Sequence, residues 1–92
     1  MIVGFRHRGL QRFFEKGDAR GLHPSHIVKI RRILTRLNAA ASVPDLSAPG
    51  LRLHRLKGAR EGEWAVDVDQ NWRITFTFDG RNCDSVNYED YH

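Results

Sequence analysis

The spacing of apolar residues changes abruptly near the middle of this 92-residue chain, and this change limits the possible folds. Before position 42, apolar side chains recur every three or four residues, which is typical of helices that bury one face. From Leu51 onward apolar and polar side chains alternate, which is typical of strands that bury one side. The pattern predicts an α+β domain, with helices first and a sheet second.

The N-terminal part predicts one short strand and two helices. The strand is indicated by three early apolar residues, Ile2, Val3 and Phe5. The first helix has apolar residues at Leu10, Phe13 and Phe14, and Gly17 fits its C-cap. Pro24 suits the first turn of the second helix, whose apolar stripe is Ile27, Ile30, Leu34, Leu37 and Ala41. Pro44 and Pro49 then predict an irregular connection.

The C-terminal half predicts the sheet. Alternation marks four stretches, at residues 51–54, 64–69, 72–78 and 86–89. Asp79-Gly80 is a strong hairpin signal, and residues 69–71 fit a turn. We expect a single domain over residues 1–92, in which two N-terminal helices pack on one face of a mostly antiparallel sheet of four to five strands.

The phase of the alternation predicts what each face of the sheet carries. Trp64 and Trp72 share the apolar phase and are expected in the core. His54, Arg73, Thr75 and Thr77 then share the opposite, uncovered face, where a site would form. Asp67 and Asp69 fall on the same face, so they are candidates to pair part of the Arg73 charge.

Composition argues against several kinds of protein. The single cysteine, Cys83, excludes an internal disulfide. His23 and His26 flank Pro24 without further ligands, so we expect two exposed histidines at a helix start and no metal site. No apolar run approaches the roughly 18–20 residues of a membrane span, and residues 5–8 do not resemble a signal peptide. We expect a soluble cytoplasmic protein without a membrane role or cofactor.

Positive charge is concentrated in the first third of the chain. Residues 1–36 hold nine Lys or Arg and two acidic residues, whereas residues 37–92 hold six and nine. Lys29, Arg32 and Arg36 point outward from the second predicted helix. This pattern favours a docking face for RNA or DNA, although it is also compatible with a solvated helix surface.

The remaining polar residues fit RNA cleavage by the 2′-hydroxyl. His54 and His92 are the acid–base candidates, because imidazole titrates near cellular pH. Lys57 and Arg73 would bind the phosphate. Asp90 would orient an imidazole or fix the backbone by a hydrogen bond, and Tyr91 would stack on a base and offer its hydroxyl to the phosphate. This site requires the last three side chains to fold back beside His54 and Arg73. Each residue also has a plainer interpretation, such as a half-buried polar histidine in a strand or, for Asn71, a residue that caps a turn.

Several segments together resemble a known family. They are Phe5 to Gly9, Phe14-Glu15-Lys16-Gly17, Leu53-His54-Arg55-Leu56-Lys57-Gly58, Arg60-Glu61-Gly62, Trp64, Asn71-Trp72-Arg73-Ile74-Thr75-Phe76 and Asn87-Tyr88-Glu89-Asp90-Tyr91-His92. From end to end the chain resembles HigB-type toxins of the RelE/ParE superfamily of bacterial toxin–antitoxin modules. The resemblance implies a RelE-like microbial RNase fold.

The resemblance also implies a function and its partners. It implies an endonuclease that enters the A site of the 70S ribosome and cuts mRNA. It also implies a HigA-like helix-turn-helix antitoxin as partner, and operator DNA is bound only through the complex of toxin and antitoxin. His54, Asp90, Tyr91 and His92 match the activity residues of the family. Lys57 and Arg73 match its phosphate-contacting positions, and Asn71 matches a position associated with codon selection.

Two other functions fit the same fold. A ParE-like inhibitor of DNA gyrase cleaves nothing and has no use for the terminal Asp90-Tyr91-His92 cluster. A non-catalytic RNA-binding module would use only the basic helices. The terminal cluster therefore distinguishes the nuclease from both alternatives.

Overall fold

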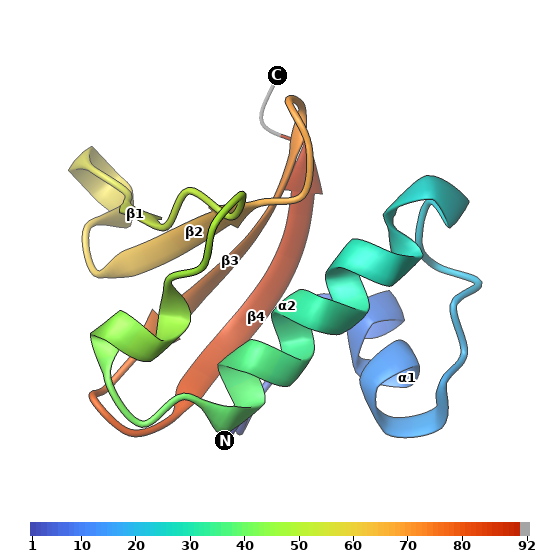
Figure 1. The fold of residues 1–92 in the computed structure, drawn as a ribbon, viewed down its shortest axis with the longest axis horizontal. Coiled ribbons are helices and arrows are strands. Elements are labelled where there is room, and N and C mark those ends of the chain that lie inside the picture. The colour runs from blue at the N-terminus through green and yellow to red at the C-terminus, as the bar shows by residue number, and fades with distance from the viewer. Residues whose placement is uncertain (91–92) are drawn as a thin grey trace.

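The computed structural model describes residues 1–90 as two layers, with α2 lying across one face of a sheet and α1 beside it (Figure 1). The sheet has four antiparallel strands in the order β1-β2-β3-β4. The helices and strands are α1 (Arg8–Lys16), α2 (Ile27–Ala39), β1 (His54–Arg55), β2 (Glu63–Asp67), β3 (Trp72–Phe78) and β4 (Cys83–Asp90). Short 3₁₀ turns are η1 (Pro24–His26), η2 (Val43–Leu46) and η3 (Gly58–Arg60). The predicted α+β architecture is confirmed.

The predicted first strand is reduced to two parallel bridges along β4. Ile2 pairs with Cys83 and Phe5 pairs with Val86, and five backbone hydrogen bonds accompany them. The pairing ends there because α1 begins at Arg8. This short segment covers the outer edge of β4, a position where an unpaired strand would invite aggregation.

The helix ends follow local capping chemistry. His7 caps α1 through Nδ1, which accepts a hydrogen bond from the Leu10 backbone, and Gly17 ends it with φ 71° as predicted. The predicted stripe of α2 is wrong at its last member, because Ala40 is extended and the helix stops at Ala39. The Ala41 amide instead donates to the Asp45 carboxylate.

The core lies between α2 and the sheet. It is built from side chains that are almost completely buried, including Ile30, Ile33, Leu34, Leu37, Val66, Ile74, Phe76 and Val86. Trp64 and Trp72 pack against this cluster but remain partly exposed. The helix-facing phase predicted for the strands is therefore correct.

Three strands differ in length from their sequence patterns, and β2 does so by only one residue. β1 is short because Arg52 takes a left-handed conformation with φ 50°, which interrupts extended backbone. β4 begins earlier than predicted, at Cys83, because a bulge at Ser85 (φ 52°) adds one residue to the strand. The bulge lets both Cys83 and Val86 face the core although they are three residues apart.

We call the side of the sheet away from the helices the open face. His54, Ala65, Thr75 and Asn87 stand in one row across it, and Asp67, Arg73 and Glu89 stand in the next row. Thr75 was expected to be uncovered, yet it is completely buried. The reason lies in an ion-pair cluster that crosses this face.

Candidate active site on the open face

His54 is held in one orientation by the backbone of Arg52, two residues before it. Its Nδ1 lies 2.8 Å from the carbonyl oxygen of Arg52. Because a carbonyl oxygen only accepts, Nδ1 carries a proton, and it is therefore Nε2 that can present a lone pair. The ring is partly exposed at the start of β1, so Nε2 is suited to take a proton from a substrate.

Arg73 lies on the same face but is paired with a residue that the sequence did not single out. Its Nε and Nη2 both lie 2.8 Å from Oε1 of Glu89. Glu89 also accepts from Arg60, whose Nη1 lies 2.6 Å from the same oxygen. The expectation that Asp67 and Asp69 pair with Arg73 is therefore replaced, since Asp67 binds Arg52 at 2.6 Å.

These ion pairs explain why Thr75 is covered. Arg60 binds Glu63 through Nε and Nη2, both at 2.9 Å, as well as Glu89. Glu63 stands opposite Thr77 and Glu89 stands opposite Arg73, so the two carboxylates flank Thr75 on either side. A guanidinium that binds both must cross the face above Thr75. The Thr75 hydroxyl is left without a hydrogen-bond partner among residues 1–90.

The cluster also shifts the ionisation of its members. Burial raises the pKa of Glu89, but the hydrogen bonds from Arg60 and Arg73 outweigh it, and the net pKa lies below the usual range. The hydrogen bonds from Arg60 lower the pKa of Glu63, and those to Glu63 and Glu89 raise the pKa of Arg60. All of these groups are charged at neutral pH.

His54 and Arg73 are close enough to share a substrate. His54 is on β1 and Arg73 is on β3, with β2 between them, and Arg73 lies two residues along β3 from the position level with His54. This spacing places their Cα atoms about 12 Å from each other. Lys57 follows β1 as the N-cap of η3 and is exposed. It lines a separate hollow of about 550 Å³ together with Arg55 and Glu61, and neither His54 nor Arg73 contributes to that hollow.

The end of the chain is only partly placed. Asp90 is the last residue of β4 and stands opposite Trp72, so alternation directs it away from the face that carries Arg73 and Glu89. Its predicted role in orienting an imidazole stays a prediction. Tyr91 and His92 lie outside the described residues, and their predicted roles do as well.

Asn71 is exposed in the turn between β2 and β3. Its backbone and that of Trp72 both donate to Oδ1 of Asp69, each at 2.9 Å. Oδ2 of Asp69 lies 2.6 Å from Nε2 of His26. The hydrogen bond from the Asn71 backbone, and then that of His26, lower the pKa of Asp69. The turn is thus tied to the start of α2, and the exposed Asn71 lies on a backbone that Asp69 holds.

Comparison with known proteins decides the family. A family model described as the RelE-like toxin of the type II toxin–antitoxin system HigB matches residues 3–92. The chain is also similar to Endoribonuclease HigB of Proteus vulgaris, with 41% identity over 92 residues that cover all of both chains. The chain belongs to the HigB-like toxins. Such a toxin has a cognate antitoxin as its partner.

His23 and His26 were both expected to be exposed, and this prediction is wrong for His26. His26 is only 6% exposed, and its Nδ1 lies 2.6 Å from the hydroxyl of Tyr88. His23 is exposed, with its ring 4.7 Å from that of Trp72. His26 is buried because its two ring nitrogens both find partners, Tyr88 and Asp69, which spacing along the chain does not reveal.

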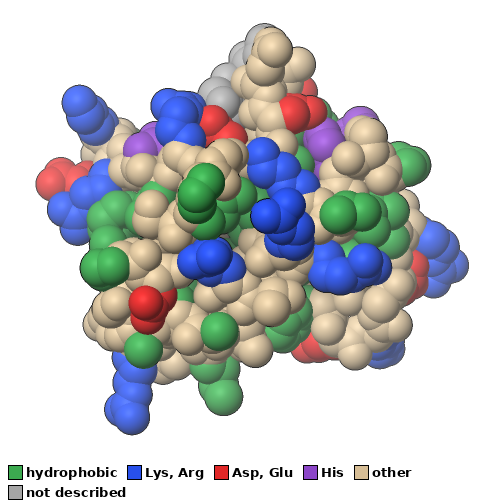
Figure 2. Space-filling model, viewed as in Figure 1, with side chains coloured by type: hydrophobic (Ala, Val, Ile, Leu, Met, Phe, Trp, Pro, Cys, Tyr) green, Lys and Arg blue, Asp and Glu red, His purple; other side chains and the backbone are tan. Residues whose placement is uncertain are grey.

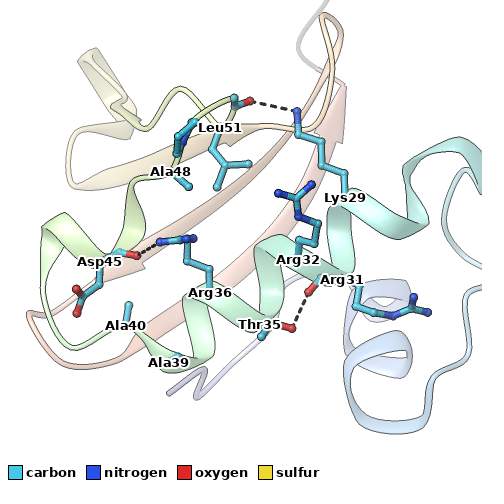
Figure 3. Close-up of a pocket in the computed structure, with 12 residues that line it drawn as sticks. Lys29, Arg31, Arg32, Thr35, Arg36, Ala39, Ala40, Asp45, Ala48 and Leu51 are labelled. Carbon is cyan, nitrogen blue, oxygen red and sulfur yellow. Dashed lines mark hydrogen bonds between the residues drawn. The ribbon is translucent and has the colours of Figure 1, made fainter.

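The basic residues of α2 lie around a groove on the helix side of the toxin. Figure 2 shows Lys and Arg side chains gathered where α2 crosses the molecule. The groove has a volume of about 940 Å³ and lies between α2 and the segment 45–51. Lys29 donates to the Gly50 carbonyl at 3.2 Å, and Arg36 donates to the Asp45 carbonyl at 3.1 Å (Figure 3). Arg36 also donates to the Ser47 carbonyl at 3.1 Å.

These contacts give the basic residues a structural task as well. Lys29 and Arg36 hold the segment 45–50 against α2, while Arg32 is exposed between them (Figure 3). Their predicted docking to the ribosome stays a prediction.

Within residues 1–90, no helix has the length and apolar character to cross a membrane, and no group of three or more metal-binding side chains gathers.

Proposed function

We propose that this toxin is a ribosome-dependent endoribonuclease that cuts mRNA in the A site and so stops translation. The observation that supports this most is the shared face of His54, with Nε2 as its acceptor, and Arg73. The name of the relative from Proteus vulgaris, Endoribonuclease HigB, points to the same chemistry. Because both comparisons are with HigB toxins, RNA cleavage is favoured over gyrase inhibition.

The reaction uses the RNA's own 2′-hydroxyl as nucleophile. Nε2 of His54 takes the hydroxyl proton, the 2′-oxygen bonds to phosphorus, and the bond from phosphorus to the 5′-oxygen breaks. His92 gives a proton to the departing 5′-oxygen, so the products are a 2′,3′-cyclic phosphate and a 5′-hydroxyl. Arg73 and Lys57 stabilise the charge on the phosphorane oxygens. This chemistry is proposed to need no metal, because protein groups supply every proton transfer and charge.

The other predicted site residues have supporting roles in this proposal. Tyr91 stacks on a base and Asp90 orients an imidazole, while Asn71 reads a codon base from its fixed turn. Lys29, Arg32 and Arg36 contact ribosomal RNA, a binding mode that weakens as salt rises. A HigA-like helix-turn-helix antitoxin neutralises the toxin in the cytoplasm, and operator DNA is bound only through that complex.

Purified toxin tests the proposal directly. It should cut mRNA on programmed 70S ribosomes, leave the same mRNA largely intact when free, and remain active in EDTA with polyamines to keep ribosomes assembled. Efficient cleavage of free mRNA, or activity that only a transition metal restores, would contradict it.

Expression in growing bacteria separates the nuclease from gyrase inhibition. Wild type should arrest translation rapidly, and His92→Ala should not. Filamentation with DNA damage that persists in His92→Ala would instead support the gyrase alternative.

A further inference from the structure

Arg60 is a charged residue of the open face for which the proposed reaction has no use. It is the last residue of η3, three positions after Lys57, and its side chain is 33% exposed. Its guanidinium contacts Glu63 at 2.9 Å on one side and Glu89 at 2.6 Å on the other. Arginine is suited to this because its planar group can bind two carboxylates in fixed geometry.

The contacts of Arg60 join three parts of the candidate site. Glu63 belongs to β2, and Glu89 belongs to β4 immediately before Asp90. Glu89 in turn binds Arg73 of β3 through the oxygen that Arg60 contacts. The turn that carries Lys57 is therefore linked through one carboxylate to the guanidinium proposed to bind phosphate.

The segment that carries Lys57 is otherwise held by backbone contacts at its base. The Leu56 amide donates to the Glu63 carbonyl at 3.0 Å, and the Glu61 amide donates to the Gly58 carbonyl at 3.1 Å. These bonds close the loop upon itself but do not connect it to β3 or β4. The Arg60 side chain makes that connection.

We propose that Arg60 and Glu89 are positioning residues that set the separation between Lys57 and Arg73. They thereby fix how far apart these two cations stand around the scissile phosphate, since the hollow that Lys57 lines does not include Arg73. This inference rests on the proposed function of the toxin. A misplacement of about 1 Å at a reacting group can slow catalysis roughly 100-fold, so a small relaxation of the cluster is enough to be measured.

The chemistry of the substitutions predicts an order of effects. In Arg60→Lys the charge remains, but an ammonium binds as a point charge and cannot hold both carboxylates in one plane. In Arg60→Met both contacts are lost. Glu89→Gln keeps a carbonyl oxygen as acceptor but loses the charge that two guanidinium groups share. The loss of activity should be smallest for Arg60→Lys.

The test is single-turnover cleavage of mRNA on programmed 70S ribosomes at increasing toxin concentration. The maximal rate should fall about 10- to 100-fold in Arg60→Met and Glu89→Gln, and less in Arg60→Lys. The half-saturating concentration should stay within about twofold, because the basic groove on α2 is unchanged. Asp18→Asn is the control, since it breaks an exposed ion pair with Arg20 outside the open face.

Each outcome supports or overturns the positioning role of Arg60 and Glu89. Full maximal rates in folded Arg60 and Glu89 variants would overturn it and leave the proposed function standing. A loss confined to the half-saturating concentration would also overturn it, because the cluster would then serve docking. A wild type that does not cut would overturn both proposals. Should Arg60→Met fail to fold in a thermal melt, the milder Arg60→Lys and Glu89→Gln carry the comparison.

Discussion

The two faces of β3 are built from neighbouring residues by different interactions. On the helix side, Ile74 and Phe76 are completely buried in an apolar core. On the open side, Arg73 and Thr75 lie under or within a cluster of two arginines and two glutamates. Burial of an apolar side chain stabilises a fold by about 1.5–3 kcal/mol, whereas the net gain from an ion pair is often small.

The difference indicates a division of tasks. Stability comes chiefly from the helix side, and the open face contributes fixed positions for charged groups. An ion pair that is only partly buried has little net effect on folding, yet it holds its members in one geometry. Substitutions on the two faces should therefore separate stability from activity.

The largest effect on stability is expected from Phe76→Ala on the helix side. Loss of this buried ring should destabilise the toxin by about 3–5 kcal/mol, measured by urea unfolding. The fraction that remains folded should cut mRNA at the wild-type rate. A loss below about 1 kcal/mol would show that the helix side is not the main source of stability.

A smaller effect is expected from Glu89→Ala on the open face. The intact ion pairs add little net stability, but the substitution leaves the partly buried charges of Arg60 and Arg73 without their shared carboxylate, which should cost about 1–3 kcal/mol. Glu15→Ala, on the exposed surface of α1, should change stability by less than about 0.5 kcal/mol. Equal effects of the two substitutions would mean that the open-face cluster is no more than solvated surface.

The pH dependence of stability sharpens the same comparison. The folded-state pKa values of Glu63 and Glu89 are lowered, so their contribution is fully present above the unfolded value of about 4.3. It is lost as the pH falls through the lower folded values. Stability measured from pH 6 down to pH 3 should drop less steeply in Glu89→Gln than in wild type. Identical slopes would show that Glu89 has no lowered pKa.

The smallest change is expected at Thr75, which lies on the open face beneath the ion-pair cluster. Its buried hydroxyl has no hydrogen-bond partner among the described residues, and a valine has nearly the same shape. Thr75→Val should leave stability unchanged or raise it by up to about 1 kcal/mol in urea unfolding. A marked loss would reveal a partner for the hydroxyl, such as bound water.

The sequence was sufficient for the fold because hydrophobic periodicity reports which side of an element is buried. The phase that places Ile74 and Phe76 inward is correct, and so is the cap at Gly17. The pattern failed where backbone conformation breaks periodicity. The left-handed Arg52 shortens β1, and the bulge at Ser85 hides the start of β4.

The candidate site was less accessible to sequence reasoning. Alternation correctly placed His54 and Arg73 on one face. Glu89 falls in the same phase but was not singled out, and this phase was the signal that could have identified the partner of Arg73. Arg60 could not be found in this way, because it is the last residue of a 3₁₀ turn whose direction depends on contacts with other strands. His26 was missed for the same reason.

The most direct test of a catalytic open face is the single-turnover cleavage rate of His54→Ala on programmed 70S ribosomes, with the RNA ends identified. Wild type should produce a 2′,3′-cyclic phosphate within the A-site codon. Folded His54→Ala should be slower by about 10²–10⁴-fold, the usual contribution of acid–base catalysis. Cleavage by His54→Ala at the wild-type rate would contradict the account.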